Sequence, residues 1–186
     1  MTPPLFRLLA ACALALLLCS SAGAQELILK NLVLDNVAGD IQLRFGVELE
    51  DLEGVEELLQ EGITIRMLSQ SSLIRKRKLI WDKTLEQKDI EFEIKKNPLT
   101  GTYSLIDSRA QRVMKNEDLP TLIQANWSTL TMSLGSWNSL PQGVAYAMNL
   151  RVVLKRANVP VWLKKALFFW SWDVVDQKNY RMDFVY

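Results

Sequence analysis

Few of the side chains that commonly do chemistry in proteins occur in this sequence. The chain has no histidine, and its two cysteines, Cys12 and Cys19, lie within the first 24 residues. Histidine-based triads, thiol nucleophiles, disulfides and the usual zinc sites are therefore excluded from residues 25–186. Serines, lysines and carboxylates remain, but no spacing singles out a Ser–Lys pair, two catalytic acids or a calcium loop. The sequence thus predicts a protein with no catalytic residue, no cofactor, no metal site and no small-molecule substrate.

The densest charge in the chain is a run of four basic residues, Arg75, Lys76, Arg77 and Lys78. Such a run suits contact with anionic headgroups or with an acidic partner. We expect residues 73–81 to be a strand, and on a strand the same charges are typical of an edge that resists pairing with another sheet. The acidic residues between positions 48 and 61 are a candidate partner within the same chain.

A second candidate surface lies near the C-terminus, where residues 160–186 hold half of the chain's aromatic residues. Residues 162–170 space apolar side chains as on a helix and place two lysines among them, as in an interfacial helix or in a connector packed over one end of the domain. The candidate contact residues of this segment are Trp162, Lys164, Lys165, Phe168 and Phe169. Beyond it, two alternating stretches flank the polar residues 176–179 and predict a C-terminal β-hairpin.

The first residues of the chain predict export. Arg7 is followed by an apolar run from position 8 to position 18, and an Ala-x-Ala pattern ends at Ala24. This is the pattern of a secretory signal peptide over residues 1–24, cut after Ala24, and the run is too short to span a bilayer. Lipidation at Cys19 is the alternative, but Leu18 stands where a lipoprotein signal needs a small residue. We expect a periplasmic protein with one domain over residues 25–186.

The elements that must position these candidate surfaces are mostly strands, because apolar residues alternate along much of the chain. The predicted strands cover residues 26–36, 41–49, 63–67, 73–81, 90–94, 102–106, 129–134 and 144–154. Two short helices interrupt them, one over residues 50–61 before Gly62 and one capped by Asn116. Strands without regularly alternating helices predict a mainly β protein: an antiparallel β-sandwich, immunoglobulin-like in the loose sense, with two short helices.

The charge balance argues against nucleic acid as a partner. Without Arg7, 21 of the 22 basic residues remain against 21 acidic ones, so the exported chain is formally neutral. Nucleic-acid binding depends on a basic surface, which a neutral chain does not provide overall.

Several of these features in order resemble an uncharacterised secreted family of proteobacteria, a domain of unknown function. They are the short helix running into Gly62-Ile-Thr-Ile, Arg77 and Trp81, the strand with Tyr103, the strand at 150–154, and Pro160 before a tryptophan-rich end. Members of that family are often encoded beside a sensor histidine kinase of the nitrogen-regulation type, which implies work in periplasmic signalling or in the envelope. The resemblance brings no catalytic or binding residue with it.

Together these observations predict a non-catalytic periplasmic protein that binds an envelope protein or the ectodomain of a membrane sensor. Two alternatives stay open. One is a protein that binds lipid or a membrane surface. The other is a small outer-membrane barrel, because alternating residues that finish on the aromatic Tyr186 also describe the last strand of such a barrel.

Overall fold

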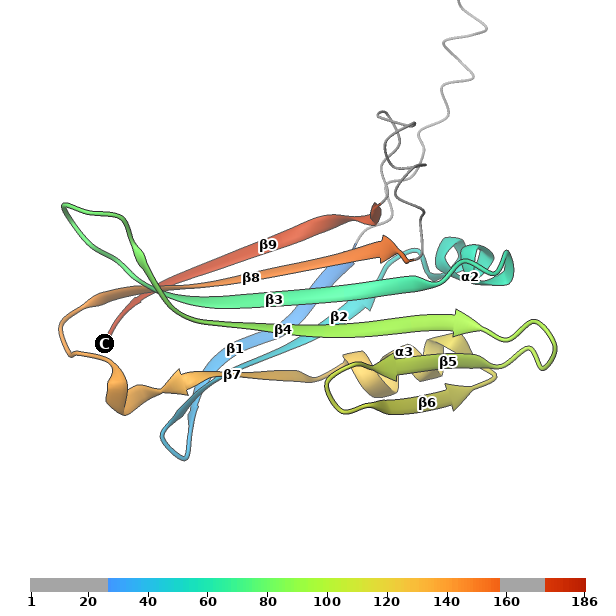
Figure 1. Ribbon diagram of the computed structural model, residues 1–186, viewed down its shortest axis with the longest axis horizontal. Helices are drawn as coiled ribbons and strands as arrows, with labels where there is room; N and C mark the ends of the chain where they lie inside the picture. Colours follow the sequence, from blue (N-terminus) through green and yellow to red (C-terminus); the bar gives the residue numbers. More distant parts are fainter. Residues whose placement is uncertain (1–26, 158–172) are drawn as a thin grey trace, which may run out of the picture.

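The computed structural model describes residues 27–157 and 173–186, and these form two packed antiparallel sheets (Figure 1). The smaller sheet has the order β1-β2-β7 and contains β1 (Leu27–Val37), β2 (Asp40–Leu49) and β7 (Leu130–Ser136). The larger sheet has the order β6-β5-β4-β3-β8-β9 and contains β3 (Ile65–Arg75), β4 (Lys83–Lys96), β5 (Tyr103–Asp107), β6 (Arg112–Asn116), β8 (Ala145–Arg156) and β9 (Asp173–Val185). The predicted β-sandwich is confirmed. The predicted signal peptide lies outside the described residues.

The core lies between the two sheets, and the period-two pattern decides which residues enter it. In β2, Ile41, Leu43 and Phe45 are buried while Arg44 is exposed. The facing residues of the larger sheet, such as Met67 and Ile94, are buried as well. Removing these apolar side chains from water is the main force that holds the two layers together.

Two short helices are present, as predicted. The first, α2 (Leu52–Gln60), is capped by the Asp51 carboxylate, which accepts a hydrogen bond from the Gly54 amide. The second, α3 (Leu119–Trp127), is capped by Asp118 and not by the predicted Asn116. Asn116 instead ends β6, and its side chain accepts a bond from the Asp118 amide, so that it shapes the turn before the helix.

The larger sheet corrects two predicted strand boundaries. Residues 69–72 do not interrupt a strand, because β3 runs through them between β4 and β8. Ser71 is buried there and its hydroxyl donates to the Asn149 carbonyl, so a polar residue fits a central strand. The strand predicted over 73–81 ends at Arg75. β6 was not predicted, since its five residues show little alternation.

The predicted C-terminal hairpin is wrong. Residues 176–179 belong to β9, a single strand that pairs with β8 over nearly its whole length. The long partner strand offers hydrogen bonds to the polar stretch, and irregularities in the register between Val152 and Lys155 accommodate it. The last aromatic residues pack on the short 3₁₀ helix η1 (Trp137–Ser139). The ring centroids of Trp137 and Tyr186 are 5.1 Å apart.

Candidate functional site

The basic run predicted from the sequence lies at the turn of the β3–β4 hairpin. The two strands pair up to Arg75 opposite Lys83, and the chain between them projects from one end of the larger sheet (Figure 1). We call residues 75–83 the basic tip. The edge-strand interpretation of this run is wrong, because β3 lies between β4 and β8 and only its last residue, Arg75, carries one of the four charges.

Three large apolar side chains lie at the end of the basic tip and face solvent. Leu79 is 96% exposed, Ile80 is 63% exposed and Trp81 is 93% exposed. Side chains of this kind are normally buried, and a contiguous exposed group of them marks an interaction site. Sequence reasoning missed this group because it placed Trp81 at the end of a strand. Three consecutive apolar residues directly after four basic ones break the period of two, and that break was the available signal.

Polar contacts hold the base of the basic tip. The Lys76 amide donates to the Ala145 carbonyl at 2.9 Å, and the Lys76 ammonium lies 3.0 Å from the Asp183 carboxylate on β9. The bond from Lys76 is the main reason why the pKa of Asp183 lies below its usual value, and Arg181 lowers it further. Across the turn, the Asp82 carboxylate accepts a bond from the Arg77 amide at 3.0 Å. These contacts fix the direction in which the tip projects.

The other charges of the basic tip are available to a partner. Within residues 27–157 and 173–186, the side chains of Arg75, Arg77 and Lys78 make no ion pair. A hollow of about 830 Å³ lies beside them, between the tip and residues 143–145. The acidic residues around α2 do not serve as their partner, because α2 lies at the opposite end of the sandwich (Figure 1).

The predicted C-terminal candidates Trp162, Lys164, Lys165, Phe168 and Phe169 lie outside the described residues. Their role as a contact surface therefore stays a prediction, and the candidate site is described without them.

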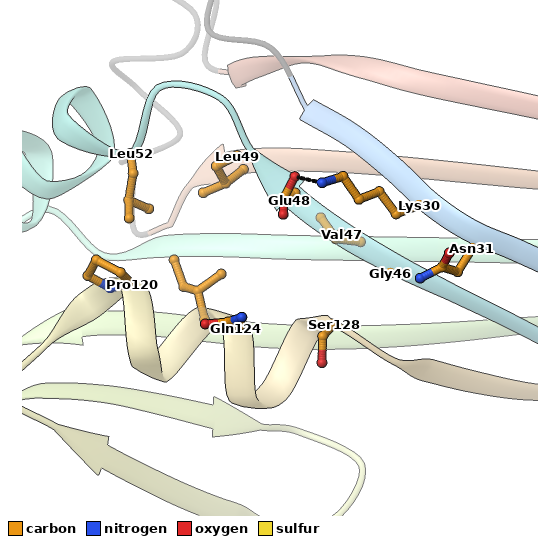
Figure 2. A pocket seen from close by; sticks show the side chains of 11 residues that line it. Lys30, Asn31, Gly46, Val47, Glu48, Leu49, Leu52, Pro120, Gln124 and Ser128 are labelled. Carbon is orange, nitrogen blue, oxygen red and sulfur yellow. Dashed lines mark ion pairs between the residues drawn. The ribbon is translucent and has the colours of Figure 1, made fainter.

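A second hollow of about 420 Å³ lies between β2 and α3 (Figure 2). Its wall includes the apolar residues Val47, Leu49 and Ile123. At its rim Lys30 pairs with Glu48, and both side chains are about half exposed. Because these two charges neutralise each other, this groove attracts a charged partner less strongly than the basic tip does.

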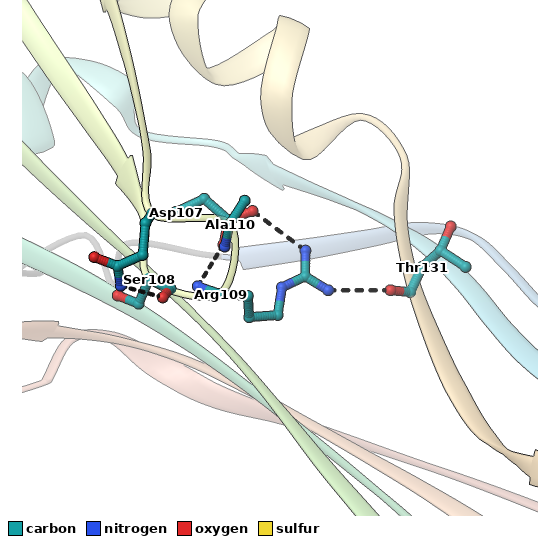
Figure 3. A network of polar contacts seen from close by, with 6 residues as sticks. Asp107, Ser108, Arg109, Ala110 and Thr131 are labelled. Atoms are coloured by element: carbon teal, nitrogen blue, oxygen red, sulfur yellow. Dashed lines mark hydrogen bonds and ion pairs between the residues drawn. The ribbon is translucent and has the colours of Figure 1, made fainter.

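A polar network around Asp107 and Arg109 holds parts of the fold together (Figure 3). The Asp107 carboxylate accepts bonds from the amides of Arg109 and Ala110, at 2.9 and 3.3 Å. The Arg109 guanidinium donates to Asp107 and, at 3.4 Å, to the carbonyl of Thr131 on β7. The network therefore joins the β5–β6 turn of the larger sheet to the smaller sheet.

No cluster of three or more histidine, cysteine or acidic side chains arranged to hold a metal ion occurs in residues 27–157 and 173–186. Among the helices of that described part, none is long and apolar enough to cross a membrane.

Comparison with known proteins yields one match. A family model described as a domain of unknown function (DUF4390) matches residues 24–183. No curated protein and no solved structure matches the chain.

Proposed function

This chain belongs to the DUF4390 family of proteins, a domain of unknown function, and we propose that it is a non-catalytic envelope protein that docks on an anionic membrane surface through its basic tip. In this proposal the signal peptide at residues 1–24 exports the chain to the periplasm. The side of a membrane that faces the periplasm then provides the docking surface.

The observation that carries the proposal is the exposure of Leu79, Ile80 and Trp81 directly after four basic residues. A membrane interface presents anionic headgroups above a region where apolar side chains leave water. Leu79, Ile80 and Trp81 at the far end of the tip suit that region, since tryptophan favours the interface. Arg75 and Arg77 precede these residues in the chain, nearer the paired base of the tip, and in this proposal they contact the headgroups. Each basic residue near an anionic surface contributes about 1 kcal/mol.

The base of the tip supports the same function. The tip projects from a hairpin whose strands are paired up to Arg75, and the Lys76–Asp183 contact ties it to β9. An ordered base lowers the entropy that is lost when the tip docks. The sensor-kinase ectodomain expected from the family resemblance remains the alternative partner, and an acidic face on such a protein would contact the same cations.

Co-sedimentation with lipid vesicles tests the proposal. Residues 25–186 are mixed with vesicles of phosphatidylcholine alone or with about one third phosphatidylglycerol, at low and high salt. We expect binding only to the anionic vesicles, weakened by salt. The double variant Leu79→Ser/Trp81→Ala and the variant Arg77→Gln/Lys78→Gln should each lose most of it.

Leu99→Ser is the matched control, because Leu99 is also exposed, at 94%, but lies in the β4–β5 turn. It should bind vesicles as the unchanged chain does. Equal binding to neutral and anionic vesicles, or full binding by the Leu79/Trp81 variant, would overturn the membrane proposal. If the Leu79/Trp81 and Arg77/Lys78 variants still bind a purified acidic ectodomain, the surface that binds such a protein lies elsewhere on the chain.

A further inference from the structure

Polar side chains occupy the middle of the outer face of the larger sheet, in two neighbouring ranks that cross four strands. The first rank, in the order β4, β3, β8, β9, is Gln87, Ser72, Asn149 and Arg181. The second rank, in the same order, is Asp89, Gln70, Arg151 and Asn179. We call these eight residues the polar grid. With strands about 4.8 Å apart and alternate residues about 6.8 Å apart, the grid covers about 14 by 7 Å.

The grid faces away from the core. In β3 the intervening residues Ser71 and Leu73 are buried, and in β8 Leu150 and Val152 are buried. Because successive side chains of a strand point to opposite faces, the grid residues point outward. All of them except Asp89 line a hollow of about 430 Å³ on the sheet surface.

The side chains around this hollow are rich in hydrogen-bond donors and carry positive charge. They supply four amide groups, from Gln70, Gln87, Asn149 and Asn179, together with the guanidinium groups of two arginines. No carboxylate lines the hollow in the described part of the chain, since Asp89 lies at the outer corner of the grid. The surface is therefore complementary to a ligand that has a negative charge and many hydroxyl groups.

Most of these donors are not used within the described part of the protein. In the parts of the chain that the structure describes, the four amide side chains and the Arg151 guanidinium make no hydrogen bond or ion pair. Arg181 is partly engaged, as it donates to Asp183 at 3.2 Å. Elsewhere on the same sheet, by contrast, Arg66 pairs with Glu91 and with Glu93. The Arg151 charge has no such partner beside it.

We infer that the polar grid binds a sugar that carries a carboxylate group. An amide side chain donates and accepts at once, which matches the hydroxyl groups on adjacent sugar carbons. The planar guanidinium of Arg151 matches a carboxylate in a bidentate pair. This site is distinct from the basic tip and does not depend on membrane docking.

Titration calorimetry with two related sugars tests the inference. N-acetylmuramic acid carries a carboxylate that N-acetylglucosamine lacks, while the two share their ring and acetamido group. We expect residues 25–186 to bind the acid saturably and to bind the neutral sugar at least about tenfold more weakly, the loss of one charged hydrogen-bonded pair. Arg151→Gln should weaken binding of the acid to the same extent, and Asn179→Ala should weaken binding of both sugars.

Arg112→Gln is the matched control, because it removes the same charge from the distant edge strand β6. It should leave binding unchanged, and thermal unfolding will show whether each variant keeps its fold. The inference is overturned by a chain that binds neither sugar, by equal affinity for both, or by equal loss in Arg112→Gln. The Leu79→Ser/Trp81→Ala variant should bind the acid normally, so failure of membrane docking and failure of this site are told apart.

Discussion

Gly46 in β2 lies directly against the carbonyl oxygen of Ser128, at the end of α3. A Cβ atom placed on Gly46 would lie 2.6 Å from that oxygen, closer than side-chain carbons approach backbone atoms. The absence of a side chain at this position lets the middle strand of the smaller sheet and the end of the helix come together. β7 then starts two residues after Ser128 and pairs with β2.

Replacement of Gly46 by alanine should therefore destabilise the protein by about 2–3 kcal/mol, since a backbone oxygen cannot move aside as a flexible side chain does. Urea denaturation measures the change. Gly101→Ala is the control: Gly101 has a φ of +72° but nothing within 4 Å of the added carbon. That substitution should cost about 1 kcal/mol, from backbone strain alone. A Gly46 variant no less stable than the Gly101 variant would contradict the close-approach argument.

We expect the Asp107–Arg109 network to stabilise the fold mainly through the amide hydrogen bonds that the Asp107 carboxylate accepts. The ion pair between Asp107 and Arg109 should contribute less. Asp107→Ala leaves two turn amides without their acceptor and should cost about 1–3 kcal/mol. Asp107→Asn keeps an oxygen acceptor and should cost less. Arg109→Gln should cost under about 1 kcal/mol, because the Arg109 side chain is 45% exposed. Denaturation curves rank the three variants, and a larger loss for Arg109→Gln than for Asp107→Ala would refute this order.

Tyr103 should titrate at an unusually high pH. Burial raises the pKa of its hydroxyl group, and the hydrogen bond that it donates to the Glu56 carboxylate raises it further, while Lys96, at 3.0 Å, partly offsets both. A group whose pKa is higher in the folded protein than in the unfolded chain contributes its full stabilisation at pH values below the unfolded pKa. This stabilisation is lost as pH rises through the folded pKa. Stability should therefore fall at alkaline pH, and less so in Tyr103→Phe. Ultraviolet titration of the phenol groups checks this, and a Tyr103 that ionises with the exposed tyrosines would contradict it.

The contact between Lys76 and Asp183 should hold the base of the basic tip in a pH-dependent way. The hydrogen bond from Lys76 lowers the pKa of Asp183 in the folded protein. The contact therefore contributes stability at pH values above the pKa that Asp183 has in the unfolded chain, and this stability is lost as pH falls through the pKa of Asp183 in the folded protein. Asp183→Asn should speed hydrogen exchange of the Lys76 amide at neutral pH. In the unchanged chain, acidification should lower the protection factor of this amide, which is the exchange rate of an unfolded peptide at the same pH divided by that of the amide, and the variant's protection factor should show no further change. An exchange rate that is the same in both chains at neutral pH would exclude the tether.

Local patterns were enough to predict the sandwich and the position of its basic run. The alternation in residues 41–49 and 144–154 depends only on which side chains leave water, and that is a property of neighbouring residues. The helix before Gly62 is equally local, because that glycine adopts a φ of +82° that suits the end of a helix. Arg75 to Lys78 could be found for the same reason, as four adjacent charges.

Only the tertiary structure decided how these pieces are used. Ser71 continues a strand because β8 supplies its hydroxyl with an acceptor 78 residues away, and residues 176–179 stay extended because β8 is long enough to pair with them. The exposure of Trp81 and the alignment of Ser72 with Asn149 likewise follow from strand pairing across the sheet. Pairing and register depend on contacts between distant residues, which a pattern of neighbours does not contain.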